Sequence, residues 1–236
     1  MNAEDLKYVN TAHPKQDVHK LRPHRPGLFR FEVAAALVPV PDGSSRALDL
    51  AGGMAEFAKV LSSKGYAVTF VDLSENNVRH AIDLGYESYK MDLNEGLAHF
   101  GHSTFGCVVI LEIIEHLIKA EYLIEEIFRV LKPGGSLILS TPNAVWLPER
   151  LRVLRGLAPA EEGYHYRFFT EQTIKKMCIR EGFSITETKF STPAFGVNLF
   201  RRRVLGRSDR IHLLVPNWAA PVLAQTIYLH AKKPGA

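Results

Sequence analysis

Apolar and polar positions alternate in blocks along this chain, and the block lengths follow a regular scheme. From residue 46 onward, short apolar runs alternate with segments in which apolar residues recur every three or four positions. The short runs predict β-strands and the periodic segments predict amphipathic helices, several of which end at a glycine. The predicted strands are 46–50, 67–73, 86–92, 107–112, 136–141, 183–190 and 226–233, and the predicted helices are 29–38, 54–64, 75–84, 119–131 and 170–181.

Strands and helices that alternate at short intervals are typical of an α/β fold, a Rossmann-like, doubly wound and mostly parallel sheet with helices on both faces. The segment 107–112 is nearly all apolar, as expected for a strand that is covered on both faces. Two segments do not fit this scheme, because 142–168 is irregular and basic and 191–222 has no clear period.

The domain boundaries follow from composition. Residues 1–26 are polar and rich in His, Lys and Pro, so we interpret them as an N-terminal arm or lid. Residues 27–236 are then one domain, within which 144–168 is an insertion on the substrate side.

Composition and charge narrow the classes of protein. Apolar residues make up 46% of the chain and charged residues 23%, which indicates a soluble globular protein rather than a disordered one. The net charge of +4 is too weak to indicate nucleic-acid binding by itself. Cys107 and Cys178 lie in separate apolar patterns, which predicts buried, reduced thiols. The first residues have no apolar signal-peptide core and no run of about 18 apolar residues occurs, so a cytoplasmic location is the default expectation.

Acidic residues mark the ends of four predicted strands. In an open parallel sheet, ligands bind beyond the carboxyl ends of the strands, so these acids are expected on one rim of the sheet. Capping of helix N-termini explains one or two such acids, but not all of them. The acids are Asp49, Asp72, Asp92 and Glu112.

The loop after the first strand argues against a phosphate ligand. A dinucleotide needs a Gly-x-Gly-x-x-Gly turn at a helix N-terminus, whereas this loop lacks that pattern and places Glu56 in the first helical turn. Asp72 follows Asp49 at a spacing that suits a carboxylate accepting from ribose hydroxyls, and Asp92 suits an adenine amine. S-adenosyl-L-methionine combines a sulfonium, a ribose and an adenine and has no phosphate, so it is the ligand that we predict.

At this point the chain resembles the class I S-adenosylmethionine-dependent methyltransferases, including the small-molecule group with the ubiquinone-pathway O-methyltransferases. The matching motifs are "LDLAGGMAEFAKVLSSKGYAVTFVDLSENNV", "MDLNEG", "CVVILEIIEHL" and "FRVLKPGGSLILSTPN", in order over residues 46–143. The resemblance implies a seven-stranded sheet with an antiparallel last strand. It also implies that Asp49, Gly52 and Gly53 hold the methionyl part, that Asp72 binds the ribose, and that Glu112 lines the cofactor through its backbone. The resemblance further implies cofactor contacts from Ala51, Leu73, Met91, Asp92 and Leu93.

The glycine loop departs from the family pattern. Where the family has Gly-x-Gly-x-Gly, this chain has Ala51, Gly53 and Ala55. Alanine cannot adopt left-handed backbone angles cheaply, so we expect cofactor binding to persist in weakened form. A non-catalytic member that serves as a partner subunit is the alternative that this loop suggests.

The residues expected beside the transferred methyl group are "EIIEHL", in which His116 is the candidate base or substrate orienter. His165, in "EEGYHYRFFT", is the second candidate. A histidine satisfied by a backbone carbonyl, and Glu115 as a cap, are the competing structural interpretations. We therefore expect an enzyme that methylates a small-molecule or lipid-linked acceptor, most readily at oxygen.

A metal-dependent reading stays open beside this one. Glu112, Glu115, His116 and His165 resemble the metal site of small-RNA 3′-terminal 2′-O-methyltransferases, and carboxylates with imidazoles suit Mg or Mn. The same pattern is common in relatives without that role, so we assign no metal ligand and do not expect nucleic acid as the substrate. The basic stretches "ERLRVLRG" and "FRRRVLGR" fit RNA, a solvated face or an anionic small substrate equally well. The oligomeric state is not encoded in any pattern that we recognise.

Overall fold

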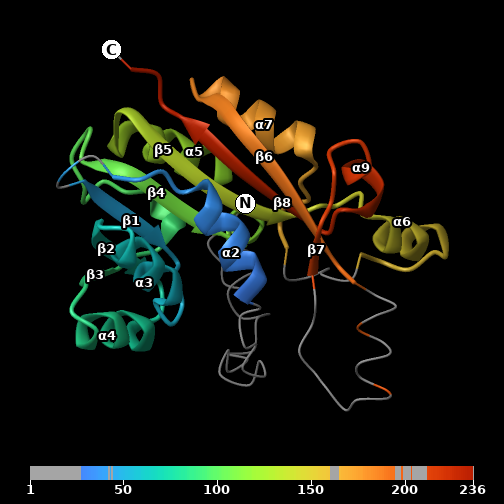
Figure 1. Ribbon diagram of the computed structural model, residues 1–236, viewed down its shortest axis with the longest axis horizontal. Helices are drawn as coiled ribbons and strands as arrows, with labels where there is room; N and C mark the ends of the chain where they lie inside the picture. The colour runs from blue at the N-terminus through green and yellow to red at the C-terminus, as the bar shows by residue number, and fades with distance from the viewer. Residues whose placement is uncertain are drawn as a thin grey trace, which may run out of the picture.

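The fold is one mixed sheet with helices packed on both of its faces (Figure 1). The computed structural model describes residues 28–41, 43, 45–159, 165–194, 198, 203 and 212–235. The predicted arm, 1–26, lies outside the described residues, as does part of the predicted insertion. The Rossmann-like architecture predicted above is confirmed in the part of the chain that these ranges cover.

Five parallel strands form the N-terminal part of the sheet. Leu50 at the end of β1 pairs with Val71 of β2 on one side and with Ile110 of β4 on the other, so these strands end at the same edge. The strand order in this part is β3-β2-β1-β4-β5. The strands are β1 (Arg46–Leu50), β2 (Ala67–Asp72), β3 (Glu87–Lys90), β4 (Phe105–Leu111) and β5 (Leu131–Pro142).

The C-terminal part of the sheet has one strand more than predicted. β8 (Thr226–Lys232) runs antiparallel between β5 and β6 (Ser184–Pro193), as expected for an antiparallel last strand. The additional strand is β7 (His212–Leu214), which pairs antiparallel with the end of β6, so the described residues form a sheet of eight strands rather than seven. Three residues are too few to reveal an alternating pattern, and the sequence around them shows no period.

Each face of the sheet is covered by its own set of helices. Apolar residues of α5 and α7 join the core on one face, and those of α2, α3 and α4 join the core on the other face. Residues such as Leu61 and Leu123, on helices of opposite faces, are completely buried. The helices are α2 (Leu28–Leu37), α3 (Glu56–Ser63), α4 (Glu75–Asp83), α5 (Ala120–Val130) and α7 (Glu171–Arg180), with short 3₁₀ turns η2 (Leu93–Glu95) and η3 (Ile114–His116).

Two short helices lie in the segments whose sequence has no clear period. α6 (Leu147–Leu154) follows the buried Trp146 and has Pro148 as its second residue, and none of its residues is buried. α9 (Ala220–Leu223) is a single turn before β8. Both helices are seen beside the end of the sheet in Figure 1. Among the helices that the structure describes, none has the length and apolar character needed to cross a bilayer.

Candidate active site

Asp49, at the end of β1, is a buried carboxylate in an unusual state. It is only 2% exposed, and its Oδ2 atom finds no hydrogen-bond partner among the described residues. Burial, and next to it the charge of Asp72, raise the pKa of Asp49 from 3.8 to about 7. An acid held in this way gains most from a ligand that brings positive charge to its neighbourhood.

The two glycines of the following loop have separate steric roles. A Cβ atom on Gly52 would lie 2.4 Å from Oδ2 of Asp49 and 2.6 Å from Cε2 of Phe70, so any side chain here would displace the carboxylate. A Cβ atom on Gly53 would meet nothing within 4 Å. The backbone at Gly53 therefore borders open space, which leaves room for a ligand to approach.

The loop backbone is left-handed at three alternate positions. The φ angles are 53° at Ala51, 58° at Gly53 and 56° at Ala55. These are the positions of the glycines in the Gly-x-Gly-x-Gly pattern discussed above. The two alanines therefore adopt left-handed angles that are costly for a residue with a Cβ atom. A left-handed alanine costs about 1–2 kcal/mol, which the surrounding structure must offset.

Asp72, at the end of β2, ties two loops together. Its Oδ2 accepts a hydrogen bond of 3.1 Å from the backbone N–H of Gly53, and its Oδ1 accepts one of 2.8 Å from that of Ser74. Each carboxylate oxygen keeps a further lone pair for a hydroxyl donor. The next residue, Leu73, leaves 63% of its side chain exposed, so it provides an apolar surface beside this carboxylate.

The segment after β3 contains the remaining predicted adenine-side residues. The Met91 N–H donates to the carbonyl of Asp72 at 3.1 Å, which fixes this segment beside the end of β2. Asp92 is exposed and caps η2, since its Oδ1 accepts from the Asn94 N–H at 2.8 Å. The side chain of Leu93 is buried in the core. The capping interpretation therefore applies to Asp92, and its proposed adenine contact would use its second oxygen.

Glu112 follows β4 and has a left-handed backbone, with φ at 57°. Its Oε1 accepts from the Ser140 hydroxyl at 2.7 Å, and its N–H donates to the Ser140 carbonyl at 3.0 Å. Burial of the carboxyl group raises the pKa of Glu112, while Ser140 and the charge of Arg30 act in the opposite direction. Ser140 and Arg30 were not foreseen, because no local pattern links residues so far apart in the chain.

The two candidate histidines lie together although 48 residues separate them. The rings of His116 and His165 are 4.7 Å apart, centroid to centroid, and meet edge to face. Glu115 Oε1 lies 4.0 Å from His116 Nε2. One ligand atom from each of Glu115, His116 and His165 falls within 4.8 Å of the others. Glu112, the fourth residue of the metal pattern, is not in this group, since its carboxylate is hydrogen-bonded to Ser140 instead.

The backbone of Glu115 holds the segment that carries His165. Its carbonyl accepts from the N–H of Tyr166 at 2.9 Å and of Arg167 at 3.1 Å, while the Arg167 side chain forms an ion pair with Glu121. The Glu115 carboxylate is buried and accepts from the Thr141 hydroxyl at 3.0 Å. His165 is thus positioned by η3, which also carries His116.

Two sets of groups therefore lie along the carboxyl edge of the parallel strands. The acids Asp92, Asp72, Asp49 and Glu112 follow the strand order β3-β2-β1-β4, and the cluster of Glu115, His116 and His165 follows directly after Glu112 in the chain. The unpartnered oxygen of Asp49 and the open space at Gly53 fit a cationic nucleoside better than a diphosphate. The histidine cluster supplies groups that can accept a proton.

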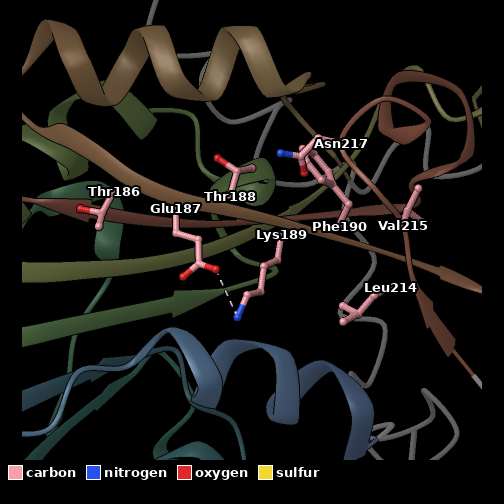
Figure 2. A pocket seen from close by; sticks show the side chains of 8 residues that line it. All are labelled: Thr186, Glu187, Thr188, Lys189, Phe190, Leu214, Val215 and Asn217. Atoms are coloured by element: carbon pink, nitrogen blue, oxygen red, sulfur yellow. Dashed lines mark ion pairs between the residues drawn. The ribbon is translucent and has the colours of Figure 1, made fainter.

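A hollow at the far edge of the sheet is a separate feature. It has a volume of about 450 Å³ and is lined by residues of β6, by Leu214 of β7, and by Val215 and Asn217 that follow it (Figure 2). Glu187 and Lys189 form an ion pair of 3.4 Å across it. Since β6 and β7 lie on the opposite side of β5 from β1 and β2, this hollow is not part of the candidate site.

Comparison with known proteins identifies relatives in sequence. The model of a family described as "Methyltransferase domain" matches residues 21–188. A ubiquinone biosynthesis O-methyltransferase from Caulobacter vibrioides is 29% identical over 161 residues, which cover 63% of this chain and 60% of that protein. One from Idiomarina loihiensis is 26% identical and is matched over 68% of each chain. The chain thus spans about three fifths of the length of the Caulobacter relative.

Solved structures share the fold at low sequence identity. An S-adenosylmethionine-dependent methyltransferase from Archaeoglobus fulgidus has a TM-score of 0.64 at 15% identity, over 98% of this chain and 100% of that chain. A second, from Mesorhizobium loti, has a TM-score of 0.61 at 18% identity, over 85% of this chain and 96% of that chain. These likenesses support the same architecture across nearly the whole length of those proteins.

Proposed function

The chain belongs to the methyltransferase-domain family, and on this premise we propose that it transfers the methyl group of S-adenosyl-L-methionine to an oxygen of a small or lipid-linked acceptor. The proposed cofactor residues are Asp49, Gly52, Gly53 and Asp72 with their neighbours at the strand ends. The single observation that carries the oxygen acceptor is the pair of imidazoles beside that rim, because a hydroxyl must lose its proton as it reacts.

The cofactor would supply an electrophilic methyl group on a sulfonium sulfur. His116 would accept the proton of the acceptor hydroxyl, so that the oxygen forms its bond to the methyl carbon as the carbon–sulfur bond breaks. The electron pair of that bond would stay on sulfur, so that S-adenosylhomocysteine would be the leaving group. Glu115, 4.0 Å from His116, lies where it can stabilise the positive charge that the imidazole gains. His165 lies against His116 and would orient the acceptor.

The nature of the acceptor is supported by the relatives. The proteins from Caulobacter and Idiomarina are named for ubiquinone biosynthesis and for methylation at oxygen. Their names favour a phenolic acceptor with an apolar chain for this protein.

The test uses the purified chain with S-adenosylmethionine and a set of catechols with and without a prenyl chain. We expect O-methylated product and S-adenosylhomocysteine, both measured by mass spectrometry. His116→Ala should lower kcat by about 10²- to 10⁴-fold and leave the Kd for the cofactor within about twofold. The matched control is His80→Ala, on the distant helix α4. An unchanged kcat in His116→Ala would contradict the assigned base.

A second candidate function is favoured by the cluster of Glu115, His116 and His165. Their ligand atoms lie within 4.8 Å of one another, and two imidazoles with a carboxylate could hold a divalent cation that binds the acceptor oxygens. In that case a chelator should abolish turnover, Mn²⁺ should restore it, and a short RNA with a free 3′ end becomes a substrate to test. Turnover that a chelator does not change would support the mechanism without a metal, in which His116 is the base. Absence of any cofactor binding in calorimetry would instead indicate a partner subunit.

A further inference from the structure

α6 is a helix whose apolar side chains are exposed. None of its residues is buried, yet four of its eight residues are leucine or valine. Leu154 is 81% exposed, and Leu147, Leu151 and Val153 are exposed as well. Apolar residues that gather on one exposed element mark an interaction surface rather than ordinary surface composition.

The apolar residues of α6 have the arrangement of an interfacial helix. Leu147, Leu151 and Leu154 are spaced by four and three residues, so they share one face of the helix. At 3.6 residues per turn, Arg150 and Arg155 lie on the two sides of this leucine face. A leucine stripe between arginines is typical of a helix that lies in the plane of a membrane interface, with its apolar side in the lipid.

A second element extends this face. The segment that leads into α9 exposes 85% of Trp218, and Val222 and Leu223 of α9 are also exposed. The Arg150 side chain donates to the carbonyl of Pro221 at 3.0 Å, which joins α6 to α9. The two helices lie next to one another at the same end of the sheet in Figure 1. Tryptophan is enriched at membrane interfaces, where its amphipathic ring sits at the level of the head groups.

We propose that this α6–α9 surface, formed by Leu147, Leu151, Leu154 and Trp218 with Arg150 and Arg155, binds the surface of an anionic phospholipid bilayer. The charges around the leucines favour an anionic bilayer as the partner, because arginines flank the leucine face. The only acid of the helix, Glu149, lies about 160–180° away from that face around the helix axis. The binding does not depend on the methyl transfer proposed above. Its consequence for that function is that an acceptor held in the lipid would reach the edge of the sheet where β5 ends and α6 begins.

The experiment is flotation of the full chain with two kinds of vesicle. One kind is phosphatidylcholine alone, and the other contains about one third phosphatidylglycerol. We expect binding to the anionic vesicles, weaker binding to the neutral ones, and loss of binding at high salt. Leu151→Asp/Leu154→Asp should lower the partition coefficient by at least about tenfold, and Arg155→Glu by at least about fivefold, since about 1 kcal/mol per basic residue is expected near such a surface.

The controls match these changes on remote surfaces. Ile82→Asp/Leu84→Asp places two acids at exposed apolar positions at the end of α4, and Lys132→Glu reverses an exposed charge near the start of β5. Both should bind as the unchanged chain does, and circular dichroism should show that every variant is folded. The proposal is overturned if the unchanged chain stays with the soluble fraction, or if the α6 variants bind equally well. It is also overturned if light scattering shows a dimer that the α6 variants convert to monomer without any vesicle binding, because the occupant is then a second copy.

Discussion

The cofactor edge, meaning the strand ends at which Asp49, Asp72 and Glu112 are proposed to bind the cofactor, and the α6–α9 surface lie in the same domain but are built in opposite ways. At the cofactor edge the chain buries Asp49, closes Asp72 onto two backbone donors and holds several residues in costly backbone angles. At the α6–α9 surface no helix residue of α6 is buried and large apolar side chains face outward. We propose that the first region is shaped by one ligand, the cofactor, whereas the second binds a lipid surface.

The distribution of backbone strain supports this contrast. Among the described residues, four that are not glycine have left-handed angles: Ala51, Ala55, Ser103 and Glu112. Three of these four border the cofactor edge. Strain of this kind persists only where surrounding contacts over-determine it, and it gathers at functional sites.

The largest effect on stability is expected from Asp49→Asn. In the folded chain the pKa of Asp49 is about 7 against 3.8 when unfolded, so between about pH 4 and 7 the folded state holds the extra proton. Stability of the unchanged protein should therefore fall as pH rises through this window, by on the order of 2–3 kcal/mol from pH 5 to pH 8. Asp49→Asn removes this slope, which urea unfolding at several pH values would measure.

The control for this pH dependence is Asp83→Asn, which changes an exposed acid on α4 and should leave the slope intact. Parallel stability curves for the unchanged protein and Asp49→Asn would mean that Asp49 is ionised across the range. The raised pKa that burial and Asp72 give to Asp49 would then be wrong.

A somewhat smaller effect is expected on cofactor affinity. Asp72→Asn replaces one accepting oxygen by a donor that faces the N–H of Gly53 or of Ser74. It also removes the negative charge of the carboxylate that we propose accepts hydrogen bonds from the ribose hydroxyls. We expect calorimetry to show an affinity for S-adenosylmethionine about 30-fold weaker, or about 2 kcal/mol, because hydrogen bonds to charged groups contribute about 1.5–3 kcal/mol. Asp83→Asn should bind S-adenosylmethionine as the unchanged protein does. Equal affinity of Asp72→Asn and Asp83→Asn for the cofactor would mean that Asp72 does not bind the ribose.

In the glycine loop, replacing alanine by glycine should change stability in the direction opposite to the same replacement in a helix. Ala51→Gly should stabilise the protein by about 1 kcal/mol, because glycine adopts a φ of 53° without the Cβ penalty. Ala36→Gly, at an exposed position in α2, should destabilise it by about 0.5–1 kcal/mol through helix propensity. Thermal unfolding of the two variants compares them directly. Destabilisation by both changes would show that Ala51 carries no backbone strain.

The smallest effect on stability is expected at the α6–α9 surface. Leu154→Ser changes a residue that is almost fully exposed, so its free energy of unfolding should stay within about 0.5 kcal/mol of the unchanged value. Chemical denaturation measures this difference. A loss above about 2 kcal/mol would mean that Leu154 packs against the chain itself, and the contrast between the two regions would disappear.

Much of the cofactor half could be predicted from the sequence. β1 was predicted with the bounds that it has, and β2 and α4 differ by one residue, since apolar runs there are bounded by glycines and acids. Strand ends place Asp49, Asp72 and Glu112 on one edge as expected, although their roles toward the cofactor remain proposals. Cys107 and Cys178 are buried and free, as predicted from their apolar surroundings.

The segments after β5, and the contacts between distant segments, could not be predicted to the same extent. β7 and α9 are too short for a periodic signal, and the three arginines in 147–155 hid the helical spacing of the leucines in α6. The sequence grouped His116 and His165 only through a resemblance to a metal site, and it is the tertiary fold that brings their rings to 4.7 Å. Interactions between distant segments, such as the effect of the Arg30 charge on Glu112, leave no trace in local composition.

The place of β8 in the sheet bears on how the protein is made. β8 follows all the other strands in chain order, yet it lies between β5 and β6. During synthesis, β5 and β6 each present an open hydrogen-bonding edge to the cell until residues 226–232 leave the ribosome and pair with both. β5 and β6 therefore have to remain apart until β8 can pair with both. A chain that ended before Thr226 would have two unpaired strand edges, which can pair with other chains, and an incomplete core.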